Sequence, residues 1–179
     1  AADLCAACDR RAFGRGERVR RILLSLAENS LLWAGPWDRA AHGAEAVAAM
    51  ARELITELGQ GASPNAHTVI AVERAAYAEG TEALSALVAL AKVCRRAEVL
   101  LIVEYELGAA AGVWELLGVL KQARWGVALQ PDETDSGTPF RNVFGRVRRG
   151  DFPPGRGFVI EGGRATPVQL ALGWGILED

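Results

Sequence analysis

The feature that most constrains this chain is a regular alternation of short apolar runs with longer segments of helical periodicity. Four runs are dominated by apolar residues and have the length of strands: residues 19–27, 67–73, 99–103 and 125–129. Three segments repeat apolar residues at the spacing that lines one face of a helix: residues 40–58, 79–96 and 113–120. Because strands that are apolar throughout are buried on both faces, the pattern predicts an α/β fold in three layers, a mostly parallel sheet with helices on both faces.

The C-terminal part predicts a different kind of pairing. Residues 158–161 and 166–172 have the composition of strands, and the turn-type residues Gly162-Gly163-Arg164 join them. A short glycine connection between two strands is typical of a β-hairpin. We therefore expect the parallel sheet to gain an antiparallel hairpin at its C-terminal edge.

Length and charge exclude several classes of protein. A chain of 179 residues is most simply one domain over residues 1–179, and its first residue is alanine, so the expectation includes a domain truncated at its N-terminus. The formal net charge of -2 argues against a strongly basic nucleic-acid binder. No apolar run reaches the roughly 18–20 residues of a membrane-spanning helix, so no span is expected.

A metal site is not expected either. Cys5 and Cys8 form a single CxxC in a segment, residues 2–13, that reads as a helix. A structural zinc site needs about four ligands, and the sequence contains no second CxxC and no HxxxH. The two cysteines therefore fit the small-residue face of a helix better than a redox or zinc pair.

Polar residues stand where the predicted parallel strands end. They are Glu73-Arg74, Glu104 and Gln130-Pro131-Asp132. In open α/β sheets, ligands bind in the crevice outside the carboxyl ends of the strands. These residues are therefore the first candidates for a binding site.

The strand that ends at Glu73 has the frame of a Walker B element, which places an Asp for magnesium after four apolar residues and then a second acid that orients water. Glu73 stands in the first acidic position, where it can reach magnesium through water, and Arg74 stands in the second. A guanidinium does not lose its proton, so Arg74 cannot act as a general base. The simpler interpretation is an ordinary strand end with solvated charges.

The phosphate-binding loop is the sharper test of nucleotide chemistry. A P-loop has the pattern GxxxxGK(S/T), whose backbone amides and lysine hold the phosphates. The 179 residues contain no such segment and no Gly-Lys pair. The sequence as given therefore cannot bind and hydrolyse ATP in the standard way.

Three motifs in the last third carry a resemblance to a known family. They are Trp125-Gly126-Val127-Ala128-Leu129-Gln130-Pro131-Asp132, Pro153-Pro154-Gly155-Arg156-Gly157 and Val168-Gln169-Leu170-Ala171. In order and spacing they resemble the C-terminal part of FtsK/SpoIIIE-type ATPase domains, especially divergent actinobacterial copies and those in the EccC proteins of type VII secretion. The resemblance implies a RecA-like core of the P-loop type.

The resemblance also implies roles for single residues. Pro154, Gly155, Arg156 and Gly157 correspond to a loop that lies near the nucleotide base or a neighbouring subunit. Glu73 falls at the Walker B position, where the family prefers Asp, and Arg74 replaces the second acid. Glu104 falls at the end of the strand that usually carries a polar sensor residue. The departures at Arg74 and at the absent P-loop imply little or no hydrolysis.

The implied function is that of a degenerate, non-hydrolysing ATPase-like domain in a translocation motor of the type VII secretion kind, with a regulatory or partner-binding role. Such a domain is cytoplasmic, belongs to a membrane-anchored complex, and contacts other ATPase domains or a secretion substrate protein. ATP and magnesium are expected to bind weakly, if they bind at all. Two alternatives stay open: a nucleotide-binding DNA translocase domain whose P-loop lies upstream, and a nucleotide-free protein-interaction module.

A basic stretch precedes the PGRG-like loop. Residues 141–156 hold five arginines against one acid, Asp151, and four of the five precede that acid: Arg141, Arg146, Arg148 and Arg149. They predict a patch that faces phosphate, DNA or an acidic partner. The alternative is a solvated loop edge, and DNA is the less supported ligand because aromatic residues for base stacking are not interleaved.

Overall fold

The computed structural model describes residues 18–27, 35–60, 66–97, 99–106, 112–123, 125–132, 144 and 147–170. The predicted helix over residues 2–13, with Cys5 and Cys8, lies outside these described residues. The chain divides into two compact units, Ala1–Leu116 and Leu117–Asp179. The helix α4 (Trp114–Leu120) runs across the boundary between the two units. That the chain is one domain stays a prediction.

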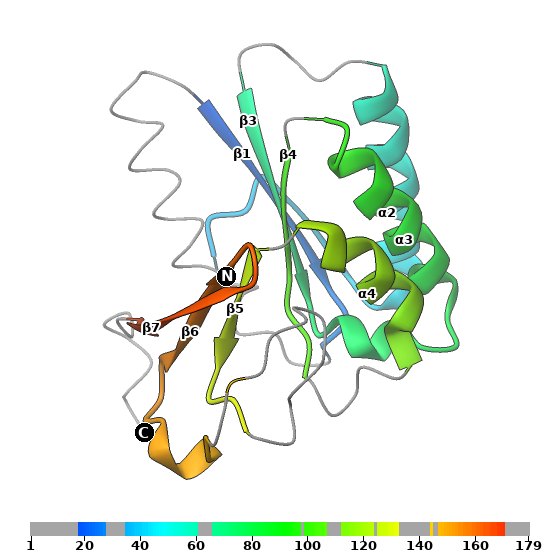
Figure 1. The fold of residues 1–179 in the computed structure, drawn as a ribbon. Coiled ribbons are helices and arrows are strands. Elements are labelled where there is room, and N and C mark those ends of the chain that lie inside the picture. The colour runs from blue at the N-terminus through cyan, green and yellow to red at the C-terminus, as the bar shows by residue number, and fades with distance from the viewer. Residues whose placement is uncertain are drawn as a thin grey trace. The chain divides into compact units, whose positions relative to one another are not determined.

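The first unit is built on a parallel sheet of four strands (Figure 1). Its members are β1 (Arg18–Ser25), β2 (Arg39–His42), β3 (Ala66–Glu73) and β4 (Val99–Val103), in the order β2-β1-β3-β4. The two central strands are buried along most of their length, and Ile22, Leu23 and Ile70 are fully buried. Burying each such side chain contributes about 1.5–3 kcal/mol. The predicted α/β class and the parallel sheet are confirmed.

Two helices cover one face of this sheet. They are α2 (Ala44–Gly59) and α3 (Glu82–Cys94), which lie side by side (Figure 1). The chain crosses from β2 to β3 through α2 and from β3 to β4 through α3, moving in the same direction across the sheet each time. Since such crossovers are right-handed, both helices fall on the same face. A helical layer on the opposite face stays a prediction, because no described helix of this unit is placed there.

The beginning of α2 corrects the sequence prediction. The periodicity predicted a helix from residue 40, but residues 39–42 form β2, which pairs in parallel with β1. The helix begins at Ala44, directly after Gly43, whose φ of 82° breaks the helical path. Alanine-rich segments have high helix propensity, and here the tertiary pairing with β1 overrides it.

The second unit is an antiparallel sheet of three strands in the order β5-β6-β7. They are β5 (Trp125–Leu129), β6 (Arg156–Glu161) and β7 (Arg164–Gln169). The predicted hairpin is confirmed, and its two turn residues, Gly162 and Gly163, have φ values of 58° and 89°. Two successive positive φ values are what a type I′ hairpin turn requires.

The expected place of residues 125–129 was wrong. They were predicted as a further strand of the parallel sheet, but β5 pairs antiparallel with β6 in the second unit. A short apolar run has the same appearance in both kinds of sheet, so periodicity alone does not identify the partner strand.

A close approach of backbones explains the glycines of the PGRG-like loop. Gly155 has a φ of 80°, and a Cβ there would lie 2.6 Å from the carbonyl oxygen of Leu170. A Cβ on Gly157, inside β6, would lie 2.0 Å from the carbonyl oxygen of Ala128 in the neighbouring strand β5. Both positions therefore require glycine for packing within the second unit.

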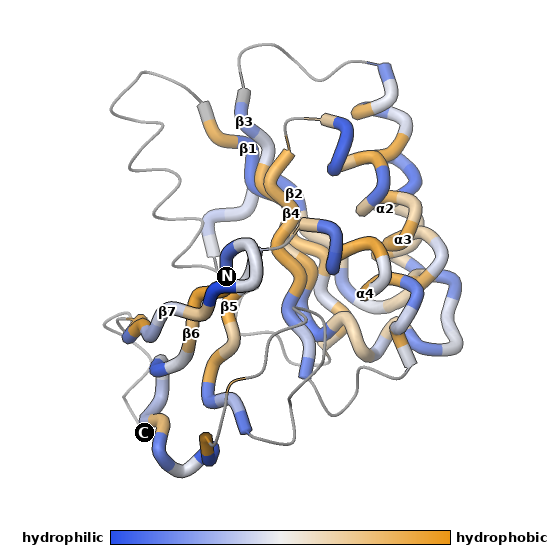
Figure 2. Tube along the Cα trace, viewed as in Figure 1, coloured by the Kyte–Doolittle hydropathy of each residue, from blue (hydrophilic) through white to orange (hydrophobic). Residues whose placement is uncertain are grey.

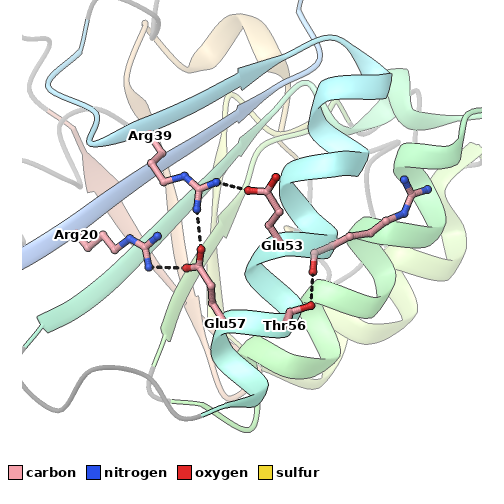
Figure 3. A network of polar contacts seen from close by, with 6 residues as sticks. Arg20, Arg39, Glu53, Thr56 and Glu57 are labelled. Carbon is pink, nitrogen blue, oxygen red and sulfur yellow. Dashed lines mark hydrogen bonds and ion pairs between the residues drawn. The ribbon is translucent and has the colours of Figure 1, made fainter.

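Four charged side chains connect α2 to the strands β1 and β2 (Figure 3). Arg20 of β1 and Arg39 of β2 each donate through Nη1 to one carboxylate oxygen of Glu57, both over 2.8 Å. Arg39 also donates through Nη2 to Oε2 of Glu53 over 2.5 Å. The hydrogen bond from Arg20, and the positive charges of Arg20 and Arg39, lower the pKa of Glu57 although partial burial opposes this.

The Glu57 contacts predict a pH-dependent contribution to stability. A depressed pKa in the folded state means that the contribution is present above the unfolded pKa of about 4.3 and is lost as the pH falls through the folded value. Because Glu57 is 41% exposed, we expect Glu57→Gln to lower the free energy of unfolding by only about 1 kcal/mol at pH 7. Urea unfolding at pH 7 and pH 3 measures this, and the difference between variant and parent should shrink at pH 3.

Glu45→Gln is the control for this experiment, since Glu45 is an exposed acid in the first turn of the same helix. It should change stability by less than about 0.5 kcal/mol at both pH values. A Glu57→Gln effect that is the same at pH 3 and pH 7 would contradict a role for the ionised carboxylate.

The loop geometry predicts that Gly155→Ala destabilises the second unit. The variant must place a Cβ against a backbone oxygen at a positive φ, which we expect to cost about 1–3 kcal/mol in the free energy of unfolding. Gly150→Ala is a matched control, since nothing lies within 4 Å of a Cβ built there. Thermal unfolding followed by circular dichroism compares them, and equal melting temperatures for the two variants would disprove the constraint.

Candidate functional site

The topology of the parallel sheet marks one place as the candidate site. The connection after β1 leads to β2 on one side, and the connection after β3 leads through α3 to β4 on the other side. The carboxyl ends of β1 and β3 are therefore neighbours whose following segments diverge. Such a topological switch point is where open α/β sheets bind ligands.

Ser25 and Glu73 meet at this switch point. They are paired residues at the ends of β1 and β3, and Ser25 is fully buried. Its Oγ donates a hydrogen bond to Oε2 of Glu73 over 2.6 Å and accepts one from the backbone N–H of Ala27 over 3.3 Å. The buried hydroxyl therefore holds one carboxylate oxygen of the predicted Walker B residue in a defined position.

His42 extends this row of residues across a third strand. It is paired with Ser25 at the end of β2, and its Nε2 contacts the carbonyl oxygen of Ala27. Sequence reasoning missed both Ser25 and His42 as site residues. The sequence does indicate Ser25 as a candidate, because its hydroxyl directly follows the apolar run 22–24. It does not indicate His42, because the local pattern predicts a helix there.

Arg74 and Glu104 form a latch between the ends of β3 and β4. Arg74 adopts a left-handed conformation with φ 54° and ψ 46°, and its backbone N–H donates to Oε2 of Glu104 over 2.7 Å. The next N–H, that of Ala75, donates to the backbone carbonyl of Glu104 over 3.0 Å. A non-glycine residue pays of order 1–3 kcal/mol for such a conformation, and Glu104 compensates it with these contacts.

The Arg74 guanidinium has an acidic partner of its own. Its Nη1 lies 3.1 Å from Oε1 of Glu106, and the two side chains are 44% and 70% exposed. The structure thus brings together Glu73, Arg74 and Glu104, which the sequence singled out separately, and adds Glu106. The carboxyl-terminal ends of β3 and β4 therefore carry three carboxylates and one guanidinium.

The carboxyl-terminal ends of these strands offer few side chains that could bind a metal ion or activate a water molecule. The Glu73 carboxylate and the Ser25 hydroxyl are oxygen ligands of the kind that magnesium accepts. Glu104, however, is engaged with the backbone of Arg74. Within the described part of the chain, no three His, Cys, Asp or Glu side chains gather closely enough to hold a metal ion.

The motif Gln130-Pro131-Asp132 does not follow a strand of the parallel sheet, contrary to the prediction. It follows β5 in the second unit, where Nε2 of Gln130 donates to the carbonyl of Phe152 over 2.9 Å. Oδ2 of Asp132 accepts from the backbone N–H of Arg149 over 3.2 Å. The motif therefore ties the end of β5 to the segment that leads into β6.

The three motifs of the last third meet in one place, which we call the motif junction and define as Gln130, residues 154–156 and residues 169–170. The backbone N–H of Gln130 donates to the carbonyl of Arg156 over 3.0 Å, and that of Leu170 donates to the carbonyl of Gly155 over 2.8 Å.

The side chain of Gln169 completes the junction. Its Nε2 donates to the carbonyl of Pro154 over 3.0 Å, and its Oε1 accepts from Nε of Arg156 over 3.3 Å. Twenty residues separate the first motif from the second and ten separate the second from the third. The three are thus bound to one another, and their spacing has a structural explanation within the second unit.

The predicted anion patch is only partly described. Arg141 and Arg146 lie outside the described residues. Arg148 and Arg149 are exposed at the start of the short 3-10 helix η5 (Arg149–Asp151), just before the PGRG-like loop. Whether these arginines bind an anion stays a prediction.

No protein-family model matches the sequence, and no curated protein matches it significantly. Solved structures do match. The cytoplasmic domain of the type VII secretion ATPase EccC from Thermomonospora curvata has a TM-score of 0.59 and 16% identity, over 84% of this chain and 19% of that one.

Two structures of EssC are also similar, with slightly lower TM-scores. The cytoplasmic domain of EssC has a TM-score of 0.56 and 15% identity, over 90% of this chain and 33% of that one. ATPases 2 and 3 of EssC from Geobacillus thermodenitrificans have a TM-score of 0.54 and 14% identity, with the same two shares. This chain therefore spans between a fifth and a third of the proteins it is similar to, and at these identities the likeness is one of fold.

Proposed function

We propose that this chain is an ATPase-like domain of a type VII secretion motor that binds ATP weakly, does not hydrolyse it, and acts by regulating or contacting neighbouring domains. The observation that supports this most is the likeness in fold to EccC and EssC over 84% to 90% of the chain. This is an analogy of fold, and the chemistry of the site has to be argued separately.

The residues at the carboxyl-terminal ends of β3 and β4 support the proposal that ATP is not hydrolysed. Glu73 has the frame of a magnesium-binding acid, but the following position holds Arg74, which cannot take a proton from water. The sequence contains no GxxxxGK(S/T) to supply a lysine and a cradle of amides for the phosphates. The ends of β3 and β4 carry three carboxylates, Glu73, Glu104 and Glu106, and these repel the β- and γ-phosphates of ATP.

The regulatory role is inferred from the kind of protein that carries this fold. One similar structure is described as containing ATPases 2 and 3, so such domains occur in series in one chain. A copy without turnover can still occupy its place beside an active one. Its partners are then other ATPase domains or the secreted protein, on the cytoplasmic side of a membrane-anchored complex.

A second candidate is a protein-interaction module that binds no nucleotide. Two exposed aromatic residues favour it: Tyr77, which is 56% exposed, and Trp114, which is 69% exposed. The segments that carry them touch, since a Cβ on Gly112 would lie 2.0 Å from Oε2 of Glu79. Large exposed aromatic side chains are the residues that most often anchor a protein partner.

Calorimetry and phosphate release test the two candidates. With magnesium and ATP, we expect binding with a dissociation constant weaker than about 100 µM, which corresponds to less than about 5.5 kcal/mol, and no phosphate release above the blank. Absence of any binding at millimolar ATP would favour the interaction module. Steady release that disappears in Glu73→Gln would disprove the non-hydrolysing function.

Arg74→Glu provides the matched variant for the same assay. It restores an acid at the second Walker B position and removes the guanidinium. Because the phosphate-binding lysine is still absent from the 179 residues, we expect no turnover in this variant either. Turnover gained by Arg74→Glu alone would show that the site is otherwise complete and that only Arg74 suppresses it.

A further inference from the structure

Glu104 stands where an apolar strand meets the charged end of the parallel sheet. All five residues of β4 are apolar (Figure 2), and Glu104, the next residue, is exposed. The register pairs Val103, the last residue of β4, with Val72, the residue before Glu73. Glu73 and Glu104 therefore end neighbouring strands side by side, an arrangement that is unfavourable for two like charges.

The contacts of Glu104 hold its carboxylate in place without neutralising it. Its Oε2 accepts a hydrogen bond over 2.7 Å from the N–H of Arg74, which belongs to the peptide group between Glu73 and Arg74. Its backbone N–H donates to the carbonyl of Val72 over 2.9 Å, and its carbonyl accepts from Ala75 over 3.0 Å. In the part of the chain that the structure describes, Glu104 forms no ion pair. Its negative charge is therefore fixed beside Glu73 and has no cationic partner.

The other two carboxylates at these strand ends differ from Glu104. Glu73 accepts a hydrogen bond from Ser25 over 2.6 Å and is the residue in the position of a magnesium ligand, so a bound cation would compensate its charge. Glu106 pairs with the Arg74 guanidinium over 3.1 Å, and its side chain is 70% exposed, where dissolved ions screen it. Of the three carboxylates, Glu104 is the one whose charge is both held in place and uncompensated.

We propose that Glu104 is the residue that sets the affinity of this site for nucleotide, because its fixed negative charge repels a polyphosphate chain. The inference rests on the proposed function, in which the chain binds ATP weakly at the ends of β3 and β4. The same carboxylate also supports the left-handed conformation of Arg74. One side chain thus has two roles, and a substitution can separate them.

Glu104→Gln is the variant that separates the charge from the hydrogen bond. The amide oxygen of glutamine can still accept from the N–H of Arg74, while the negative charge is lost. Isothermal titration calorimetry of the 179-residue chain with magnesium and ATP measures the effect. We expect the dissociation constant to fall on the order of tenfold at an ionic strength of about 0.05 M, and by only about threefold at 0.5 M, because ions screen exposed charges.

Two further probes show whether the effect acts on the phosphates. Inorganic tripolyphosphate, which has neither base nor sugar, should gain affinity in Glu104→Gln by a factor similar to that of ATP. Adenosine, which carries no charge, should gain none. A gain for adenosine equal to that for ATP would mean that the substitution reshapes the site, and it would overturn the proposal.

Two other variants control for net charge and for the conformation of Arg74. Glu53→Gln removes one negative charge near the other ends of the strands, where Glu53 pairs with Arg39, the first residue of β2, and it should change the affinity by less than about twofold. Glu104→Ala removes both the charge and the hydrogen-bond acceptor. Tighter binding in Glu104→Ala without tighter binding in Glu104→Gln would assign the effect to the backbone of Arg74 and contradict the proposal.

The possible outcomes distinguish a failure of this inference from a failure of the proposed function. If the parent chain binds ATP weakly and Glu104→Gln binds it no more tightly, the inference is wrong and the proposed function stands. If the parent chain releases phosphate, the proposed function is wrong, and the ratio of the two dissociation constants still tests Glu104. If neither chain binds ATP at millimolar concentration, both are wrong.

Discussion

The parallel pairing of β1 with β3 is the interaction on which the rest of the first unit depends. It joins eight residue pairs, from Arg18 with Ala66 to Ser25 with Glu73, and buries the apolar side chains of both strands. Because β3 lies on the side of β1 away from β2, the connections diverge there and create a switch point. The same order of strands places α2 and α3 on one face. Pairing, helix placement and candidate site are thus consequences of one arrangement.

At that switch point, the hydrogen bonds fix the positions of the Glu73 carboxylate and of the Arg74 backbone. The Ser25 hydroxyl fixes an oxygen of Glu73, and Glu104 holds the backbone of Arg74 in a strained conformation. Carboxylates outnumber the single guanidinium, which is unfavourable for a triphosphate without a lysine beside it. The proposed non-hydrolysing role follows from this arrangement together with the fold that the chain shares with EccC and EssC. The motif junction has a structural role, because its hydrogen bonds connect the ends of β5, β6 and β7.

Much of the fold could be predicted, and the failures have physical reasons. Strong local patterns located β4 at residues 99–103 and β3 within one residue, since long apolar runs have few alternatives. β2 was missed because Arg39-Ala40-Ala41-His42 has the local preference of a helix, and only its pairing with β1 makes it a strand. β5 was assigned to the wrong sheet for a similar reason. Ser25 became a site residue only once the register placed it opposite Glu73. Long-range pairing, which a local pattern does not contain, decided each of these cases.

The most direct test of the central claim is a two-dimensional amide NMR titration with millimolar magnesium and ATP, followed in parallel by phosphorus spectra of the nucleotide. If the carboxyl-terminal ends of β1, β3 and β4 form a non-hydrolysing nucleotide site, the largest chemical-shift changes fall on Ala27, Arg74 and Ala75. The N–H groups of these residues donate hydrogen bonds to Ser25 or Glu104. The phosphorus signals of ATP then stay unchanged over hours. Conversion to ADP, or shifts that avoid these amides and gather elsewhere in the chain, would contradict the claim.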